Sequence, residues 1–331
     1  MTADCPKPVL SIIIPVYREA AALLHNFLEI EKHAAATGLS HEYILVDDGS
    51  PDGTWEVVKS LRDGSRRLEG IRFSRNFGKE AAISAGLARA RGAAAIVMDA
   101  DLQHPPELIP EMVRLWRDER YDVVEAVKVD RGRESLPYKM SAHLFNWLMC
   151  RLTGYQFAGA SDFKLLDRRV VDAWLTLGET NTFYRGLVSW MGFRHAQVPM
   201  RVAERIGGGT AWSTLRLAKM AVLALTSFSS MPLHIISLLG GILIALGSVM
   251  AAWTIVRWVM GWAVAGFTTV ILLQVMIGGI LATSLGIIGV YLSQIYAEIK
   301  RRPRYLVVEA IAETAPPVHQ PDEHRSGQQD V

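Results

Sequence analysis

The sequence lacks the features that mark several common protein classes. Its 331 residues hold two cysteines, Cys5 and Cys150, which lie far apart and match no metal-binding or redox spacing. Neither G-x-G-x-x-G nor G-x-x-x-x-G-K-[ST] occurs, which excludes a dinucleotide dehydrogenase and a P-loop enzyme. Because Pro15 interrupts the first short apolar run, we expect no signal peptide. The sequence therefore favours a protein whose first domain stays in the reducing compartment where it is made.

Charged residues are absent from two long stretches near the C-terminus. Residues 235–256 and 258–297 contain no Asp, Glu, Lys or Arg, and Arg257 alone separates them. A helix crosses a hydrocarbon core of about 30 Å with roughly 20 apolar residues, so each stretch is long enough. One core helix of a soluble protein could imitate such a run, but two in succession predict two transmembrane helices.

Basic residues lie on both outer sides of this apolar pair. Arg216 and Lys219 precede it and KRRPR at 300–304 follows it, whereas the connecting loop holds only Arg257. The positive-inside rule then places both chain ends in the cytoplasm, with the lipid bilayer as a partner. We interpret KRRPR as a topology signal at the lipid headgroups, and we expect no nucleic-acid partner.

The chain divides into four predicted parts. These are a soluble domain at 1–215, an amphipathic juxtamembrane segment at 216–232, two transmembrane helices with a short external loop at 233–297, and a basic segment with a disordered tail at 298–331.

Apolar strands and helices alternate through the soluble domain. Continuous apolar runs at 9–14, 42–46, 70–74 and 94–98 are predicted strands, with helical patterns between them, the first at 19–36. Such strands predict an α/β fold, a mostly parallel, doubly wound sheet covered on both faces. Ligands bind such sheets at the carboxyl ends of the strands, which is where the polar motifs fall.

The sequence DADLQ directly follows the predicted strand at 94–98. Asp99, Asp101 and Gln103 alternate, so their side chains converge if extended geometry continues past the strand. Their hard oxygen ligands suit Mg²⁺ or Mn²⁺ and suit zinc poorly. The alternative is a solvated strand end before a helix, since two prolines and Glu107 favour a first helical turn. The neighbouring acids at the same sheet edge favour the metal site.

The sequence VDDGSPDGT places two acids at the end of the strand at 42–46. Asp47 or Asp48 could accept hydrogen bonds from a base or ribose, as acids do in nucleotide-binding sheets. Alternatively, both could cap the next helix.

These motifs, taken in order, resemble family 2 glycosyltransferases of the GT-A fold. The resemblance rests on SIIIPVYREA, LVDDGSPDGT, RNFGKEAAISAGLARARG, MDADLQHPPELIPEM, SDFKLLDRRVVDAW, NTFYRGLVSWMGFR and SFSSMPLHI, with two apolar stretches after them. It extends over residues 9–305 and is strongest to bacterial polyprenyl-phosphate glycosyltransferases, including bactoprenol glucosyltransferases. Dolichol-phosphate mannose synthase is a more distant likeness.

The resemblance implies a role for each matching residue. The donor-binding set is Pro15, Tyr17, Glu19, Asp47, Asp48, Asp99, Ala100, Lys128 and Arg205. The metal ligands are Asp99, Asp101 and Gln103, and the catalytic residues are Asp101, Asp162 and Arg205. Arg205 would reach the donor phosphates and Asp162 would lie near the sugar and the acceptor, with Arg75 and Lys79 nearby. Two positions depart from the family pattern. Ala211 stands in place of the family lysine, which would remove one cation from the implied phosphate clamp, and Lys128 stands where many relatives have arginine.

The implied reaction is an inverting transfer of a sugar from a nucleoside diphosphate sugar to polyprenyl (undecaprenyl) phosphate. It would occur at the cytoplasmic face of the bacterial inner membrane, need Mg²⁺ or Mn²⁺, and supply lipid-linked sugar for cell-envelope glycans. A non-catalytic membrane scaffold is one alternative. A processive polysaccharide synthase is disfavoured because Q-x-x-R-W is absent. The small residues of GGILATSLGIIG could serve a homo-oligomer or ordinary packing of the two spans.

Overall fold

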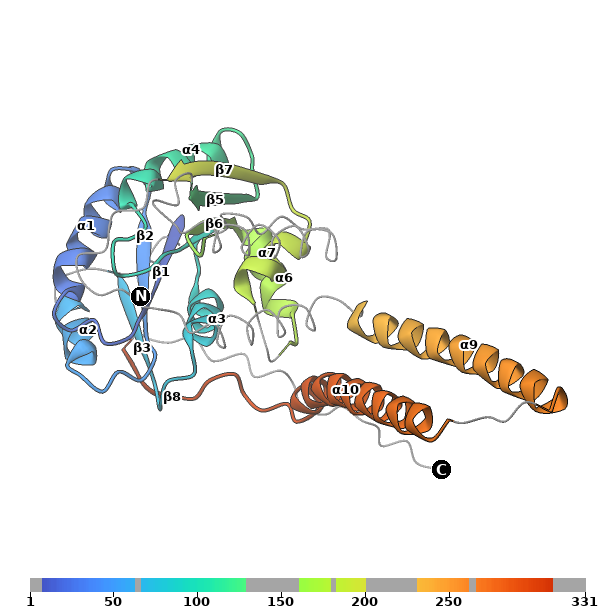
Figure 1. Ribbon diagram of the computed structural model, residues 1–331. Helices are drawn as coiled ribbons and strands as arrows, with labels where there is room; N and C mark the ends of the chain where they lie inside the picture. Colours follow the sequence, from blue (N-terminus) through green and yellow to red (C-terminus); the bar gives the residue numbers. More distant parts are fainter. Residues whose placement is uncertain are drawn as a thin grey trace, which may run out of the picture.

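The computed structural model of the chain describes residues 8–62, 67–128, 161–179, 183–200, 231–261 and 266–311. It consists of an α/β domain from which two long helices extend (Figure 1). The strands are β1 (Leu10–Val16), β2 (His41–Asp47), β3 (Leu68–Phe73), β4 (Ala94–Val97), β5 (Val123–Lys128), β6 (Lys164–Asp167), β7 (His195–Met200) and β8 (Val307–Ile311). The helices of the α/β domain are α1 (Leu23–Ala35), α2 (Thr54–Arg62), α3 (Lys79–Arg89), the 3₁₀ turn η1 (Pro106–Leu108), α4 (Ile109–Arg117), α6 (Arg168–Thr176) and α7 (Tyr184–Trp190). The two long helices are α9 (Met231–Val259) and α10 (Phe267–Ile299).

The described strands form one sheet in the order β7-β5-β6-β4-β1-β2-β3-β8. Strands β1, β2, β3 and β4 run parallel to one another, and β5 runs parallel to β7. Strand β6 runs antiparallel to β4 and β5, and β8 runs antiparallel to β3. The predicted mostly parallel, doubly wound sheet is confirmed, with two antiparallel strands that the sequence pattern did not reveal.

Strand β1 shows why the central strands are mostly apolar on both faces. Ile12 and Ile14 pack with α1, α2 and α4 on one face, while Ile13 packs with α3 and α6 on the other. All three side chains are fully buried. A strand covered on both faces cannot alternate between apolar and polar residues, so the continuous run is the expected signature.

The order of the strands reverses at β1. The chain passes from β1 to β2 and β3 on one side, then crosses over to β4 on the other side. Such a switch point leaves a crevice at the carboxyl ends of the strands, where open α/β sheets bind their ligands. Strand β6 starts at this same edge, because Lys164 pairs with Val97 at the end of β4.

The turn between β1 and α1 differs from the sequence prediction. The helix predicted from residue 19 begins at Leu23, and Arg18 adopts a left-handed φ of 59°. The backbone N–H groups of Ala22 and Leu23 donate to the carbonyl oxygen of Glu19. Glu19 therefore lies in a turn at the mouth of the sheet instead of in the helix.

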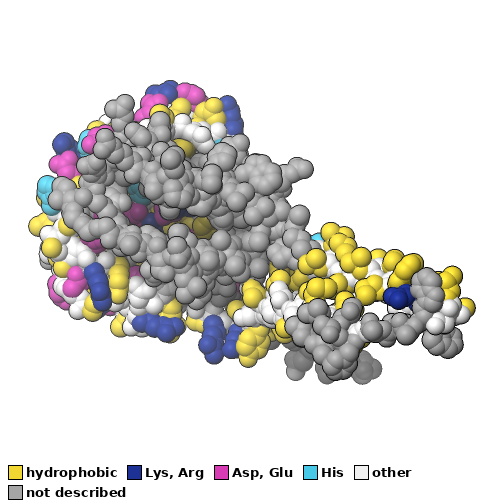
Figure 2. Space-filling model, in the orientation of Figure 1, with side chains coloured by type: hydrophobic (Ala, Val, Ile, Leu, Met, Phe, Trp, Pro, Cys, Tyr) yellow, Lys and Arg dark blue, Asp and Glu magenta, His cyan; other side chains and the backbone are white. Residues whose placement is uncertain are grey.

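Helices α9 and α10 are long and apolar enough to cross a membrane, judged by length and composition. The candidate spans are Ile236–Arg257 and Met276–Ile299. Large apolar side chains on both helices are exposed, and Figure 2 shows hydrophobic side chains gathered along this part of the molecule. An added Cβ at Gly278 or Gly289 would meet no other atom within 4 Å, so these glycines do not mediate packing of the two spans in the described structure.

Strand β8 returns the chain to the α/β domain after the second long helix. It lies at the sheet edge beside β3, where Glu309 pairs with Arg72 in register. The Glu309 carboxylate accepts a hydrogen bond of 2.7 Å from the Trp55 indole N–H. The ring of Tyr305 stacks on Phe73 with centroids 4.8 Å apart. The chain on both sides of the apolar pair is thus joined to one sheet.

Candidate active site

A cavity of about 370 Å³ opens at the carboxyl edge of β1, β2 and β4. Its lining includes the predicted residues Pro15, Tyr17, Glu19, Asp48, Asp99, Ala100 and Asp101, together with Val16, Asn76, Gly78, Lys79 and Ala82. These residues come from the ends of three parallel strands and from the start of α3. The structure therefore brings most of the predicted donor-binding residues into one cavity.

The two adjacent acids after β2 take different positions. Asp47 is fully buried below the cavity, where its carboxylate accepts a hydrogen bond from the Ser50 N–H at 3.0 Å. Asp48 lines the cavity, and its carboxylate accepts hydrogen bonds from the N–H groups of Phe77 (2.6 Å) and Gly78 (2.9 Å). Asp48 thus holds the loop that precedes α3, which is a different helix from the one expected to be capped. Burial raises the pKa of Asp48, and these two N–H groups oppose the rise.

The turn after these acids requires glycine. Gly49 has a φ of +66°, which strains residues with a side chain. A Cβ there would also lie 2.5 Å from the backbone carbonyl carbon of Arg75. The close approach brings the loop before α3 against the end of β2, and this contact closes one side of the cavity.

The DADLQ sequence does not continue as a strand. Strand β4 ends at Val97, Leu102 has a left-handed φ of 55°, and the Gln103 N–H donates to the Asp101 carboxylate at 3.0 Å. Asp99 and Asp101 both line the cavity, and Gln103 does not. The extended geometry assumed for the three-ligand site is therefore wrong, while metal binding by these residues remains a prediction.

The described residues hold no cluster of three or more His, Cys, Asp or Glu side chains in metal-binding proximity. The acids of the cavity nevertheless interact electrostatically. Burial raises the pKa of Glu19, and the negative charges of Asp101, Asp52 and Asp99 raise it further. Hard carboxylate oxygens under mutual repulsion suit a divalent cation that takes its other ligands from a bound diphosphate.

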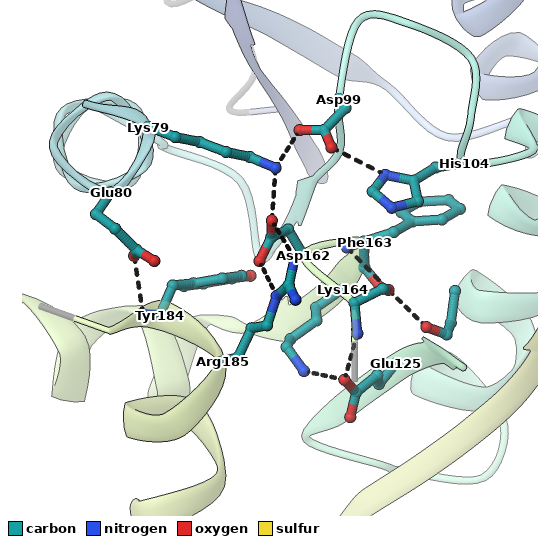
Figure 3. A network of polar contacts seen from close by, with 12 residues as sticks. Lys79, Glu80, Asp99, His104, Glu125, Asp162, Phe163, Lys164, Tyr184 and Arg185 are labelled. Carbon is teal, nitrogen blue, oxygen red and sulfur yellow. Dashed lines mark hydrogen bonds and ion pairs between the residues drawn. The ribbon is translucent and has the colours of Figure 1, made fainter. Parts of the chain in front are cut away.

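Asp162 lies at the centre of an ionic network (Figure 3). Its carboxylate accepts a hydrogen bond of 2.5 Å from the Lys79 ammonium, and bonds of 2.6 and 2.9 Å from Nε and Nη2 of Arg185. The same ammonium lies 2.5 Å from Asp99. Burial alone would raise the pKa of Asp162, but Arg185 and Lys79 hold it well below its ordinary range. Asp162 is thus an ionised, fully engaged carboxylate beside the cavity.

His104 is a site residue that the sequence reasoning missed. Its ring is buried, stacks on Phe163, and places Nδ1 3.6 Å from Asp99. Burial lowers the pKa of His104, against the opposing charge of Asp99. The available signal was a histidine five residues after the strand-end acid Asp99, but its ring stacks on Phe163, which is distant in sequence.

Glu80 and Arg185 were also missed. The Glu80 carboxylate accepts a hydrogen bond of 2.8 Å from the Tyr184 N–H, which ties the start of α3 to the start of α7. Burial raises the pKa of Glu80 to about 7.

Arg205, the predicted phosphate-binding arginine, and Ala211, which stands in place of the family lysine, lie outside the described residues. Lys128 ends β5 at the same sheet edge, in register with Met200. Their predicted roles stay predictions.

Known proteins are similar in sequence to this chain over most of its length. Residues 11–170 match the family model for glycosyl transferase family 2. The chain is 38% identical over 300 residues to the uncharacterized glycosyltransferase sll0501 of Synechocystis sp. (strain ATCC 27184 / PCC 6803 / Kazusa), covering 90% of this chain and 94% of that protein. It is 31% identical over 300 residues to a prophage bactoprenol glucosyl transferase homolog of Escherichia coli (strain K12), covering 90% and 98%. It is 30% identical over 300 residues to the bactoprenol glucosyl transferase of Shigella phage SfII, covering 90% and 97%.

Among solved structures, the mannosyltransferase PcManGT from Pyrobaculum calidifontis, in complex with GDP-Man and Mn²⁺, aligns with a TM-score of 0.42 at 17% identity. That alignment covers 84% of this chain and 87% of that one.

The sheet, the acid-lined cavity at its switch point and the relatives named glycosyltransferase define a sugar-transferring enzyme. The chain belongs to glycosyl transferase family 2.

Proposed function

We propose that this glycosyltransferase moves a sugar from a nucleoside diphosphate sugar to polyprenyl phosphate, with inversion at the anomeric carbon. The observation that carries the proposal is an acid-lined cavity in the same chain as two apolar, exposed helices. Relatives named bactoprenol glucosyl transferase, similar over 90% of this chain, support a polyprenyl phosphate acceptor.

The donor would occupy the cavity at the ends of β1, β2 and β4. Its nucleotide would contact Pro15, Tyr17 and Asp48, which line the cavity. The buried Asp47 does not line it and would hold the turn after β2 through its hydrogen bond from the Ser50 N–H. Arg205 is proposed to reach the donor phosphates, because an arginine fork matches phosphate oxygens in geometry and charge.

Asp99 and Asp101 are the proposed protein ligands for Mg²⁺ or Mn²⁺, with Gln103 as a further ligand. When bound, the ion would neutralise the charge that develops on the departing diphosphate. The chain's own contribution is to hold two carboxylates at one wall of the cavity. Lys79 contacts Asp99 and keeps its carboxylate directed along that wall.

The acceptor needs little help to become a nucleophile. A phosphate monoester has its second pKa near ~6, so its oxygen is largely ionised at neutral pH. Asp162 is held ionised by two cations, and a carboxylate with a lowered pKa is a poor proton acceptor. We therefore assign Asp162 an orienting role instead of a general-base role.

The membrane arrangement follows from the helices and from β8. Helices α9 and α10 would cross the inner membrane of a bacterium, and β8 brings the following segment back to the α/β domain. Both ends of the apolar pair would then lie on one side, and the flanking basic residues support the cytoplasm as that side. The proposed parts remain 1–215, 216–232, 233–297 and 298–331, with β8 as an addition to the first part.

Transfer can be tested with the full chain in detergent. The protein would receive Mg²⁺ or Mn²⁺, a short polyprenyl phosphate and a panel of labelled nucleoside diphosphate sugars, and label in the lipid phase would be counted. We expect one donor to label the lipid in a metal-dependent manner. Donor binding without transfer from any sugar would instead favour the non-catalytic scaffold.

A further inference from the structure

Lys79 and Arg185 both bind the buried carboxylate of Asp162, beside the cavity. The Asp162 side chain is 7% exposed, whereas Lys79 and Arg185 are 39% and 42% exposed. Arg185 presents its fork to Asp162 through Nε and Nη2, and Lys79 binds the same carboxylate from the opposite side (Figure 3). The buried acid therefore fixes the positions of two cationic groups whose side chains are partly exposed.

Both cations keep unused hydrogen-bond donors. An ammonium has three N–H groups, and Lys79 directs contacts to Asp162 and Asp99. A guanidinium has five, and Arg185 uses two on Asp162 within the described part of the chain. Counted over the described residues, one ammonium N–H and three guanidinium N–H groups are then left for an anion.

The pair Lys79 and Arg185 lies at the edge of the donor cavity instead of inside it. Lys79 lines the proposed donor cavity, but Arg185 and Asp162 do not. An anion held between Lys79 and Arg185 would therefore lie beside a bound donor without occupying its place. A second substrate that carries a phosphate needs such a position if its oxygen is to approach the donor sugar.

We propose that Lys79 and Arg185 bind the phosphomonoester of the lipid acceptor, with Asp162 as the positioning residue that holds both cations. The assignment rests on the proposed function and adds the residues that would recognise the acceptor. A guanidinium fork and an ammonium suit phosphate oxygens, which accept several charge-assisted hydrogen bonds. The donor diphosphate offers the same chemistry, so the test must separate the two sources.

The test uses binding, so it does not depend on turnover. Calorimetric titrations of the full chain in detergent would compare a short polyprenyl phosphate, the unphosphorylated alcohol and a nucleoside diphosphate. We expect Arg185→Gln and Lys79→Met each to weaken binding of the phosphorylated lipid by about 10- to 100-fold, the usual effect of losing a charged hydrogen bond. Binding of the nucleoside diphosphate should change by less than about 2-fold for Arg185→Gln, on the scale of an uninvolved surface residue.

Two controls separate recognition from folding. Arg185→Lys keeps a positive charge on Asp162 and should retain more lipid affinity than Arg185→Gln, with unfolding temperature measured for both. Arg169→Gln, an exposed and ion-paired arginine on α6, should bind the lipid like the parent chain. A structural role alone would not change the preference for phosphorylated over unphosphorylated lipid.

Each outcome decides a different point. Unchanged lipid affinity in folded Arg185→Gln would overturn the proposed acceptor site. Selective loss of nucleoside diphosphate binding would reassign the pair to the donor and would also overturn it. If the parent chain itself binds no polyprenyl phosphate, the proposed function fails and the acceptor site fails with it.

Discussion

The α/β domain and the helical pair α9–α10 use the same apolar residue types in opposite ways. In β1, every isoleucine is buried between two layers of helices, and the polar groups collect at one edge of the sheet. In α9, Ile244 is 73% exposed and its apolar neighbours also face outward. Exposed apolar surface of this extent suits lipid, not water. The difference is what we expect of a chain with one water-soluble domain and two helices that could cross a membrane, with β8 as the return connection to the domain.

Substitution at the polar edge should have the largest effect. Asp101→Ala would remove a proposed metal ligand from the cavity, and losing several kcal/mol of charge stabilisation corresponds to at least about a 100-fold fall in transfer rate. Initial rates at saturating donor and acceptor would measure it. Asp172→Ala, an exposed acid on α6, is the matched control and should transfer at the parent rate. Equal rates for both variants would remove Asp101 from the site.

A charged residue in the first candidate span should prevent its insertion into a membrane. Leu246 lies within the first candidate span and is exposed, so Leu246→Asp would place a carboxylate in the hydrocarbon core. Insertion of that helix should become about 3 to 4 kcal/mol less favourable. Membrane fractionation would show a larger soluble or degraded pool than for Leu246→Ile. If both variants fractionate alike, the segment does not cross the membrane.

The burial of Glu80 between α3 and α7 predicts a dependence of stability on pH. Because the pKa of Glu80 is raised to about 7 in the folded chain, the folded state binds more protons than the unfolded state between pH 4.5 and 7. Its stabilising contribution is therefore complete below about pH 4.5 and is lost as the pH rises through about 7. The loss is on the order of 2 to 3 kcal/mol.

Glu80→Gln tests this dependence because glutamine can still accept the Tyr184 hydrogen bond. Its unfolding free energy should vary less between pH 5 and pH 8 than that of the parent chain, with the gain at pH 8. Parallel curves for the two proteins would show that Glu80 does not titrate in this range.

Substitution at the contact between β3 and β8 should have the smallest effect, a moderate loss of stability. A Cβ at Gly70 would lie 2.7 Å from the side chain of Ile311 and 2.9 Å from that of Val58. Gly70→Val should therefore destabilise the α/β domain by about 1 to 3 kcal/mol, as overpacking does. Adding Ile311→Ala should recover part of the loss, measured by thermal unfolding of the single and double variants. Strict additivity of the two substitutions would argue against the β3–β8 contact.

The sequence predicted those parts of the molecule that depend on local pattern. Buried strands such as β1 and β2 produce continuous apolar runs, and the acids that end them, including Asp48 and Asp99, mark the carboxyl edge. Two charge-free runs likewise predict α9 and α10 without knowledge of any contact. In each of these cases, the signal lies within a single segment.

The contacts between distant segments could not be predicted in this way. Lys79 meets Asp162 across 83 positions of the chain, because β6 inserts antiparallel beside β4. Strand β8 has a short apolar pattern that does not specify β3 as its partner. The left-handed Leu102 turns DADLQ out of its strand, although alternation alone suggested otherwise. Each of these features depends on tertiary pairing or on a backbone turn.

The most direct test of the account is the identity of the lipid product. The full chain in vesicles would receive its donor, Mg²⁺ or Mn²⁺, and either polyprenyl phosphate or polyprenol of equal length, and the lipids would be analysed by mass spectrometry. The account predicts one sugar added to polyprenyl phosphate, none added to polyprenol, and no product when the metal is chelated. Several sugars on one lipid, sugar on polyprenol, or donor hydrolysis alone would contradict it.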